Sequence, residues 1–535
     1  MIKNTKIFLA VWGLLLSSML MGSPKGEPDI RVVSYAALTE ARLDTVIVAR
    51  VGDLVITAKE FLLGFEYGPA FVKRNRDSKA RYLEFMINEK LLALDGYDRN
   101  LDTNRQVVET IKEIEGDLAT EELYREDVLS QVKITEEEIA EGIARERRHL
   151  SLKWLYAPTF DEIDALQKQL QAGVPFDSLF NRQLSESVPL EDRFMETTRF
   201  RLQTKNPVLS SIVDTLSHQS NSTAIGTADG WYIVRIVQQW TNPIMTESEQ
   251  MKLQHDIQRA IFKQKADALS DKYVHQLMLD HDPVIVRSTF DLLRAYLGKK
   301  ILPPDKFTDW ELTKNLMAEY GPRDSVEVDD HLDKTLVKLT QGQIRLQDFM
   351  VWFRTREAVI RFSVSSPQAF FVSLEQLIWR MVRDHLLVKR AFARDMHLRE
   401  SVKTQKIWWR DKSVYALTKS QLARRIKLNE KQLKEYYEKN NYSFHNRSGA
   451  LIPFEKAKDD VLREAYQEAL TQKKLRHILT LKRKYPVTIN QPVLNSLQVD
   501  MEHQLNAIDV YTVKKGGTFP RPAFPTIDPD WQAWY

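Results

Sequence analysis

The feature that most constrains this 535-residue chain is an internal repeat with a very long period. Residues 48–61 are typical of a short strand, a tight Gly-Asp turn, a second short strand and a helix capped by Thr57. Residues 336–349 show the same pattern, with Phe349 at the position of Phe61. Two further pairs of segments match at offsets of 295 and 294: residues 86–92 with 381–387, and 134–139 with 428–433. The nearly constant offset predicts one structural unit used twice, with a generic likeness among amphipathic helices as the alternative.

After its hairpin, each copy is predicted to continue as helices. Apolar residues recur at three- and four-residue steps, the spacing of a helix with one buried face: Leu83, Met86, Ile87, Leu91 and Leu94. Thr135 and Glu138 have the spacing of a capping box that opens a later helix. We therefore interpret the apolar stripes as core.

Composition excludes several classes of protein. The 77 Lys and Arg against 73 Asp and Glu leave a net charge of +4, too small for a dedicated nucleic-acid binder. Cysteine is absent, which excludes disulfides, thiolate zinc sites, iron–sulfur clusters and a cysteine nucleophile. The dispersed histidines offer no plausible metal site, and no phosphate-binding or hydrolase motif is present, so we expect neither a metal nor a cofactor.

The small net charge conceals opposite charges in the two copies. Residues 86–140 hold 6 basic and 15 acidic residues, a net of −9, whereas residues 381–434 hold 15 and 5, a net of +10. Two solvated helical faces that drifted apart would explain this difference. Alternatively, one copy faces the other within the chain or across an antiparallel dimer, or the basic copy faces an anionic lipid or acidic partner.

The first residues have the order of a secretory signal. Lys3 and Lys6 precede an apolar run over residues 7–21, which is followed by Gly22 and Ser23. The run is shorter than a spanning helix requires. We expect residues 1–22 to be a signal peptide and the mature chain to be periplasmic, with retention as an inner-membrane anchor as the alternative.

The order of these segments resembles a known family. A hairpin, a helix over residues 83–92 and a capped helix after residue 134 are similar to the SurA-N-like chaperone module of exported folding factors, the SurA, PrsA and PpiD group. In that group a parvulin-type peptidyl-prolyl isomerase domain follows. Residues 149–158 resemble its first strand, 161–179 its helix and turn, and 209–234 its last helix, loop and strand.

The resemblance implies a mainly α (α+β) fold, with the helical module used twice and a parvulin-like α+β domain inserted in the first copy. The two flanks of each module are expected to come together in space. The predicted parts are a signal peptide (1–22), a first module (46–148), the parvulin-like domain (149–240), a returning helix and connector (245–330), a second module (335–445), a second returning helix (446–500) and an extended tail (501–535).

The parvulin-like domain departs from its family at the site. Where parvulins carry two histidines beneath a proline-binding cleft and a phenylalanine in its wall, the chain aligns Trp154, Tyr232 and Leu209. Residues 188–195 replace the family's glycine-rich loop without any glycine. The resemblance thus implies a peptide-binding cleft at Trp154, Leu209 and Tyr232 but supplies no confident catalytic residue. An active isomerase with altered residues is the alternative.

The C-terminal tail interleaves prolines with aromatic residues, among them Phe519, Phe524, Trp531 and Trp534. This composition favours an extended, polyproline-like chain. Either the tail wraps around its own chain and buries these side chains, or it is a peptide that docks in the groove of an envelope partner.

We expect a periplasmic chaperone or foldase that holds unfolded exported or outer-membrane proteins, with a parvulin-like domain that lacks prolyl isomerisation or is weak in it. Two other hypotheses stay open: an active peptidyl-prolyl cis-trans isomerase, and a structural accessory subunit of an envelope export or assembly complex. The expected partners are unfolded or nascent polypeptides, with a homodimer as a further option and no nucleic acid.

Overall fold

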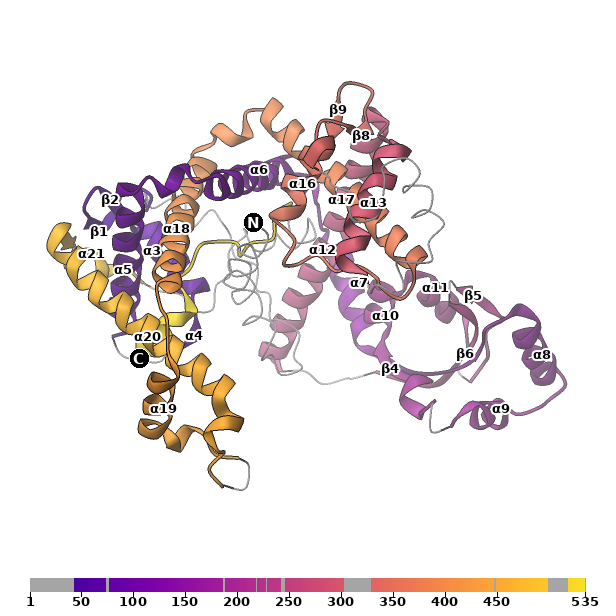
Figure 1. Cartoon of the computed structure of the whole chain (residues 1–535). Helices are drawn as coiled ribbons and strands as arrows, with labels where there is room; N and C mark the ends of the chain where they lie inside the picture. Colours follow the sequence, from indigo (N-terminus) through magenta and orange to yellow (C-terminus); the bar gives the residue numbers. More distant parts are fainter. Residues whose placement is uncertain are drawn as a thin grey trace. The chain divides into compact units, whose positions relative to one another are not determined.

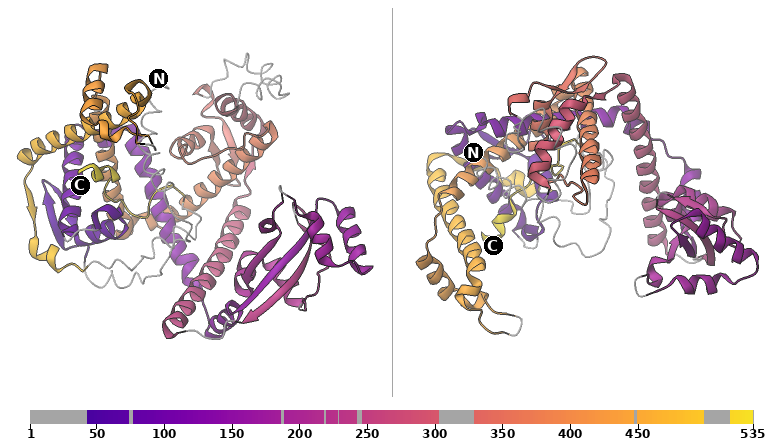
Figure 2. Two further views of the ribbon diagram at one scale, coloured as in Figure 1. Left: turned by 90° about the horizontal axis from the view of Figure 1, so that it is seen from below. Right: turned by 45° about the vertical axis from the view of Figure 1, so that its right-hand side comes forward.

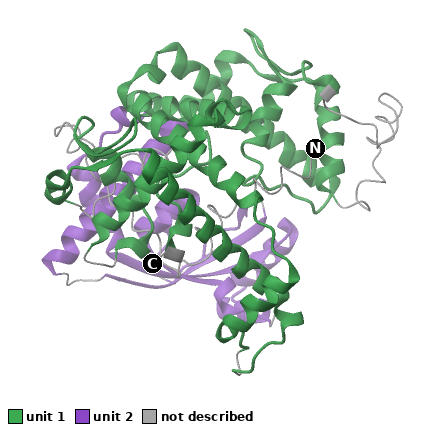
Figure 3. Ribbon diagram, turned by 60° about the vertical axis from the view of Figure 1, so that its left-hand side comes forward, with its two compact units in different colours: residues 1–127, 271–535 green, residues 128–270 purple. Residues whose placement is uncertain are grey.

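A computed structural model describes residues 43–73, 77–185, 188–217, 219–227, 229–241, 246–302, 329–446, 449–498 and 518–534. The chain divides into two compact units, Val128–Ser270 and the remainder, Met1–Asp127 with Asp271–Tyr535 (Figure 3). Helices dominate and the sheets are small, so the predicted mainly α (α+β) class is confirmed. The predicted signal peptide lies outside the described residues. No helix in the described part of the chain combines the length and apolar character needed to cross a membrane.

The first copy of the repeat has the predicted order of elements (Figure 1). Its elements are β1 (Ile47–Val51), β2 (Leu54–Thr57), α3 (Ala58–Tyr67), α4 (Ala70–Lys73), α5 (Ser78–Asp98), the 3-10 helix η2 (Leu101–Thr103), α6 (Arg105–Asp127), the 3-10 helix η3 (Leu129–Gln131) and α7 (Glu136–Glu146). Gly52 makes the hairpin turn at φ +53°, a conformation that favours glycine. The Thr57 hydroxyl accepts a hydrogen bond from the backbone N–H of Glu60, as predicted for a helix cap. The five residues of the predicted apolar stripe are all buried.

The second copy repeats this order closely. After the 3-10 helix η6 (Asp329–His331) come β8 (Thr335–Lys338), β9 (Gln343–Arg345), α16 (Leu346–Arg354), α17 (Pro367–Ala393), the 3-10 helix η7 (Met396–Leu398), α18 (Glu400–Arg424), α19 (Glu430–Lys439) and the 3-10 helix η8 (Asn441–Ser443). Asn100 and Asp395, 295 positions apart, both adopt left-handed backbone angles, at φ +54° and +56°. Capping boxes open α7 at Thr135 and α19 at Asn429. The internal repeat is therefore confirmed as one unit used twice.

In each copy the helices that flank the inserted segment pack against each other, but the short strand that follows the second flank pairs with the hairpin of the other copy. α7 packs on the returning helix α12 (Glu247–His281), where a Cβ at Gly142 would lie 2.5 Å from Ile257, and α19 shares a core with the second returning helix α20 (Phe454–Lys484). However, β7 (Val284–Ile285), which follows α12, pairs with β8 of the second copy. β10 (Val487–Ile489), which follows α20, pairs with β1 of the first copy.

The flanks of each copy therefore come together as expected through their helices, but their strands pair with the other copy. Each hairpin has an open edge whose backbone groups need a partner, and the strand that reaches it belongs to the other half of the chain. The resulting sheets have the orders β10-β1-β2 and β7-β8-β9. Two short helices follow the exchanged strands at equivalent positions, α13 (Arg287–Ile301) and α21 (Gln491–Ser496).

The oppositely charged copies face each other within the chain. Acidic side chains of α5 and α6 form ion pairs with basic side chains of α16 and α18 and of the residues just after α16 and α17: Glu89 with Lys412 (2.7 Å), Glu109 with Arg354 (3.0 Å), Glu113 with Arg356 (2.8 Å), Glu115 with Lys406 (2.7 Å), and Glu126 and Asp127 with Arg394. The helices also approach closely, since a Cβ at Gly96 of α5 would lie 2.4 Å from Val414 of α18. Of the alternatives for the opposite charges, the structure shows the one in which one copy faces the other within the chain.

The described part of the tail, residues 518–534, is buried in its own chain. Phe519, Phe524 and Trp531 are each at most 2% exposed. The Trp531 ring stacks on Phe85 with centroids 5.3 Å apart. Of the two alternatives for the tail, the structure shows the one in which it packs on its own chain. Pro529–Trp534 form the 3-10 helix η9 where an extended chain was expected, because the backbone N–H of Trp531 bonds back to the carbonyl of Asp528.

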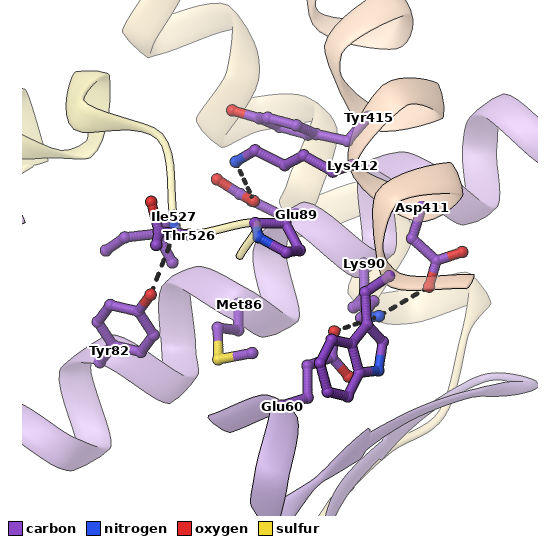
Figure 4. Close-up of a pocket in the computed structure, with 12 residues that line it drawn as sticks. Glu60, Tyr82, Met86, Glu89, Lys90, Asp411, Lys412, Tyr415, Thr526 and Ile527 are labelled. Atoms are coloured by element: carbon purple, nitrogen blue, oxygen red, sulfur yellow. Dashed lines mark hydrogen bonds and ion pairs between the residues drawn. The ribbon is translucent and has the colours of Figure 1, made fainter. Parts of the chain in front are cut away.

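Acidic residues of the first copy hold the tail through its main chain. Asp117 accepts hydrogen bonds from the backbone N–H groups of Thr518 and Phe519. Glu89 accepts hydrogen bonds from the backbone N–H of Asp528 and from the Trp531 indole. The Tyr82 hydroxyl accepts one from the backbone N–H of Ile527 (Figure 4). Because these bonds satisfy polar atoms that would otherwise be buried without partners, the tail is part of the core.

The smaller unit contains a four-stranded antiparallel sheet of order β4-β3-β6-β5, in which β3 and β6 are the two long strands (Figure 2). Its elements are β3 (Arg148–Ala157), α8 (Phe160–Gln171), α9 (Phe176–Gln183), the 3-10 helix η4 (Leu190–Asp192), β4 (Phe194–Thr198), α10 (Arg199–Lys205), α11 (Pro207–Thr215), β5 (Ile225–Thr227) and β6 (Gly230–Thr241). α8 and α9 share a core with one face of the sheet, and α10 and α11 with the other. The first strand, the following helix and the closing helix and strand are thus present where the sequence predicted them.

The complementary charges give a first prediction. Lys406→Glu would place two carboxylates against each other at Glu115 and should lower the free energy of unfolding by about 1–3 kcal/mol. Combining it with Glu115→Lys restores an ion pair and should recover most of the loss, measured by urea unfolding as a double-mutant cycle. Lys431→Glu, at an 85% exposed side chain, is the control and should change little. A double variant no more stable than Lys406→Glu would contradict the pairing.

A second prediction concerns Lys474, which is 1% exposed. Its ammonium lies 4.6 Å over the Trp531 ring and has no hydrogen-bond partner among the described residues. Burial, with repulsion from Lys419, lowers the pKa of Lys474 to about 8. The buried charge therefore destabilises the fold below pH 8, and this penalty disappears as pH rises toward the unfolded value of about 10.5.

Lys474→Met should accordingly raise the free energy of unfolding by about 1–3 kcal/mol at pH 7, even after the loss of the contact with Trp531. The advantage over the native chain should shrink between pH 8 and pH 10.5, which urea titrations at both ends of that range would measure. A variant that is less stable at pH 7, or whose difference is independent of pH, would contradict the assignment.

Candidate functional site

A cleft of about 650 Å³ opens on the α11 face of the sheet in the smaller unit. Trp154 of β3, Leu209 of α11 and Tyr232 of β6 all line it. The structure thus brings together the three residues that the sequence placed at a peptide-binding cleft. All three are half-buried, so each has one side in the core and one side toward the cleft.

Strand geometry explains why these side chains converge. β3 and β6 pair antiparallel with Trp154 opposite Val234 and Tyr156 opposite Tyr232. Because successive side chains alternate between the faces of a sheet, Trp154, Tyr156 and Tyr232 all point to the same face. The Tyr156 and Tyr232 rings lie 5.2 Å apart, so Tyr156 is the direct neighbour of Tyr232. The sequence analysis missed Tyr156, although the period of two from Trp154 would have identified it.

Asp229 organises the polar end of the cleft. Its carboxylate accepts hydrogen bonds from the hydroxyls of Thr227 and Tyr232, both at 2.6 Å, and its backbone carbonyl accepts one from the Tyr156 hydroxyl at 2.7 Å. These side-chain hydrogen bonds hold the pKa of Asp229 below its ordinary value. Desolvation and the bond to Asp229 raise the pKa of Tyr232 to about 12. At neutral pH the cleft therefore has an ionised Asp229 and a neutral Tyr232.

Arg193 supplies a positive charge beside the aromatic walls. It lies between η4 and β4, and its backbone carbonyl accepts a hydrogen bond from the N–H of Trp154. Its guanidinium lies 4.9 Å over the Tyr156 ring and lines the cleft. Residues 188–195 were recognised in the sequence only as a loop without glycine, and no local pattern indicated that Arg193 enters the cleft.

The arrangement is suited to binding. Histidine is not among the residues that line the cleft, and His149 at the start of β3 stacks on Trp240 instead. Aromatic faces with a few placed polar groups are what peptide and small-molecule sites generally provide. No cluster of three or more potential metal ligands occurs in the described part of the chain.

A second pocket lies in the larger unit, among Glu60, Lys90, Asp411 and the tail (Figure 4). Lys90 binds both carboxylates at 2.7 Å, and burial raises the pKa of Glu60 although Lys90 opposes the change. The pocket measures about 40 Å³, enough for ordered water and too small for a substrate. We therefore assign it a structural role in joining α3, α5, α18 and the tail.

Comparisons with known proteins give matches among solved structures. No protein-family model matches it, and no curated protein does. Among solved structures it is similar to the foldase protein PrsA of Streptococcus pneumoniae str. Canada MDR_19A, with 13% identity, a TM-score of 0.19 and coverage of 42% of this chain and 93% of that one. PrsA of Bacillus subtilis gives 14% identity, a TM-score of 0.16 and coverage of 42% and 92%. These TM-scores are too low to carry an argument about function.

The cleft geometry gives a prediction at Gly230, which has φ +143°. An added Cβ would lie 2.5 Å from the Tyr156 ring and 2.8 Å from the carbonyl oxygen of Ala157. Gly230→Ala should therefore displace Tyr156 and lower the free energy of unfolding of this unit by about 2–4 kcal/mol.

Gly173→Ala is the matched control, because Gly173 also has a positive φ, +90°, but no atom within 4 Å of an added Cβ. It should lower stability by only about 1–2 kcal/mol through backbone strain. Urea unfolding followed by tryptophan fluorescence compares the two variants. Equal losses would show that the contact with Tyr156 and Ala157 is unimportant.

Proposed function

We propose that the protein is a chaperone of the foldase type, which holds unfolded exported polypeptides, and that its parvulin-like domain binds chain segments without isomerising them. The observation that carries this proposal is the open cleft walled by Trp154, Tyr156 and Tyr232 in the smaller unit. Such a cleft offers apolar surface to an unfolded segment and needs no nucleotide, since clients leave by folding.

The residues of the cleft argue for binding over isomerisation. Rotation about an X-Pro bond is slowed by a barrier of about 18–20 kcal/mol, and an isomerase lowers it by favouring the twisted amide over the planar one. The family to which the sequence was likened places two histidines beneath its cleft, and the equivalent positions here are Trp154 and Tyr232. The Tyr232 hydroxyl donates a hydrogen bond to the Asp229 carboxylate, and this bond stabilises the walls of the cleft.

The place of action is also part of the proposal. Residues 1–22 have the order of a signal peptide, so we place the mature chain in the periplasm, with exported or outer-membrane proteins as clients. The larger unit by itself consists of two halves that are joined by exchanged strands and ion pairs. An accessory subunit that docks through its tail is less well supported, because the tail aromatics are buried in the chain itself.

The proposal predicts the outcome of two assays on the full chain. It should suppress aggregation of a chemically denatured, unrelated protein at near-equimolar concentration, and it should not accelerate proline-limited refolding of a model substrate. Trp154→Ala combined with Tyr232→Ala should weaken the suppression severalfold, because the walls of the cleft are lost.

Trp231→Ala is the control, since Trp231 lies on the same strand but packs on Phe160 at the opposite face. It should leave the suppression nearly unchanged, with circular dichroism confirming that all variants are folded. A rate gain in refolding that disappears with Trp154 and Tyr232 would establish an active isomerase instead. No suppression of aggregation would favour the accessory subunit.

A further inference from the structure

We propose that Arg193 makes the cleft selective for polypeptide segments that carry a carboxylate next to an apolar or aromatic residue. This inference rests on the proposed function, because it names the class of segment that the same cleft would take. The inference concerns the positive charge of Arg193, for which the resemblance to parvulins gives no role.

The first argument is that Arg193 is left without an anionic partner. No hydrogen bond or ion pair joins its guanidinium to another described residue, and its Nε atom is buried without a partner. Three other arginines of the same unit are paired, Arg145 and Arg199 with Asp214 and Arg201 with Glu146, whereas Arg235 on the opposite face of the sheet, like Arg193, only lies over an aromatic ring. A half-buried, unpaired charge costs stability unless a ligand supplies the opposite charge.

The second argument is that the carboxylates of the cleft do not neutralise Arg193. Asp229 is occupied by the hydroxyls of Thr227 and Tyr232. Asp192 is exposed and forms no ion pair with its neighbour Arg193. The guanidinium fork is therefore available, and its planar pair of N–H donors matches an incoming carboxylate better than any neutral group.

The third argument concerns the walls around the charge. Trp154, Tyr232 and Leu209 present apolar surface, and Val208 at the rim is 66% exposed. A volume of about 650 Å³ admits a few residues of an extended chain and excludes a folded domain. The segment that fits places an apolar or aromatic side chain against these walls and its carboxylate on Arg193, either from Asp or Glu or from the chain's C-terminus.

Fluorescence anisotropy with the full chain tests this directly. The probes are peptides Gly-Ala-X-Phe-Pro-Ala-Gly that carry an uncharged fluorophore, so that the label adds no carboxylate, with an amidated C-terminus and X as Glu, Gln or Lys. A further probe is the Gln peptide with a free C-terminal carboxylate. We expect the Glu peptide to bind about tenfold more tightly than the Gln peptide, and the Lys peptide most weakly. Tight binding by the free-carboxylate peptide would identify the C-terminus as a second source of the same group.

Variants of Arg193 separate charge from packing. Arg193→Gln should abolish the difference between the Glu and Gln peptides, and Arg193→Lys should retain part of it. Arg182→Gln, at an exposed arginine of α9, is the control and should preserve the full difference.

Equal binding of the Glu and Gln peptides, or a preference that persists in Arg193→Gln, would overturn the selectivity while leaving the chaperone proposal intact. Failure of every peptide to bind would overturn both proposals at this cleft.

Discussion

Each hairpin of the larger unit is a two-stranded ribbon that needs a third strand, and in this chain the other copy supplies it. β10 completes the sheet of the first copy and β7 that of the second. Two strands alone are marginally stable in water, and their open edges carry unpaired backbone groups. The two copies therefore cannot separate without exposing both edges. Within one chain this is the arrangement that a strand-exchanged homodimer would have between two chains.

The polar interactions of the larger unit follow from this arrangement. Helices of opposite charge are brought face to face, so acidic side chains of α5 and α6 meet basic ones of α16 and α18 and of the residues just after α16 and α17. The tail then enters among them and uses the same acidic residues: Glu89 holds Lys412, the Trp531 indole and the backbone of Asp528. Arg521 pairs with Asp117 and Glu121 where all three are buried. Removing one member of such a group leaves its partners buried and uncompensated, which is why single changes here should be severe.

Much of this fold could be predicted from the sequence because the repeat, the helix caps and the apolar stripes are local signals. The opposite charges left contact between the copies as one of several alternatives, because solvated faces that drifted apart would give the same charge counts. The strand exchange could not be predicted, because Val487–Ile489 has the same local pattern whichever hairpin it completes. In the cleft, alignment identified Trp154, Leu209 and Tyr232, and strand periodicity would have added Tyr156. Arg193 enters the cleft only through the path of an irregular loop, and no sequence period describes that path.

The buried tail determines when the chain can finish folding. Asp117 accepts a hydrogen bond from Thr518, which lies 401 residues further along the chain. Glu89 likewise accepts a hydrogen bond from Asp528, 439 residues further along. A chain that is made, and in our proposal exported, from its N-terminus presents the first hairpin with an open edge until β10 is available. A product truncated before residue 518 would also lack the tail residues that are part of the core.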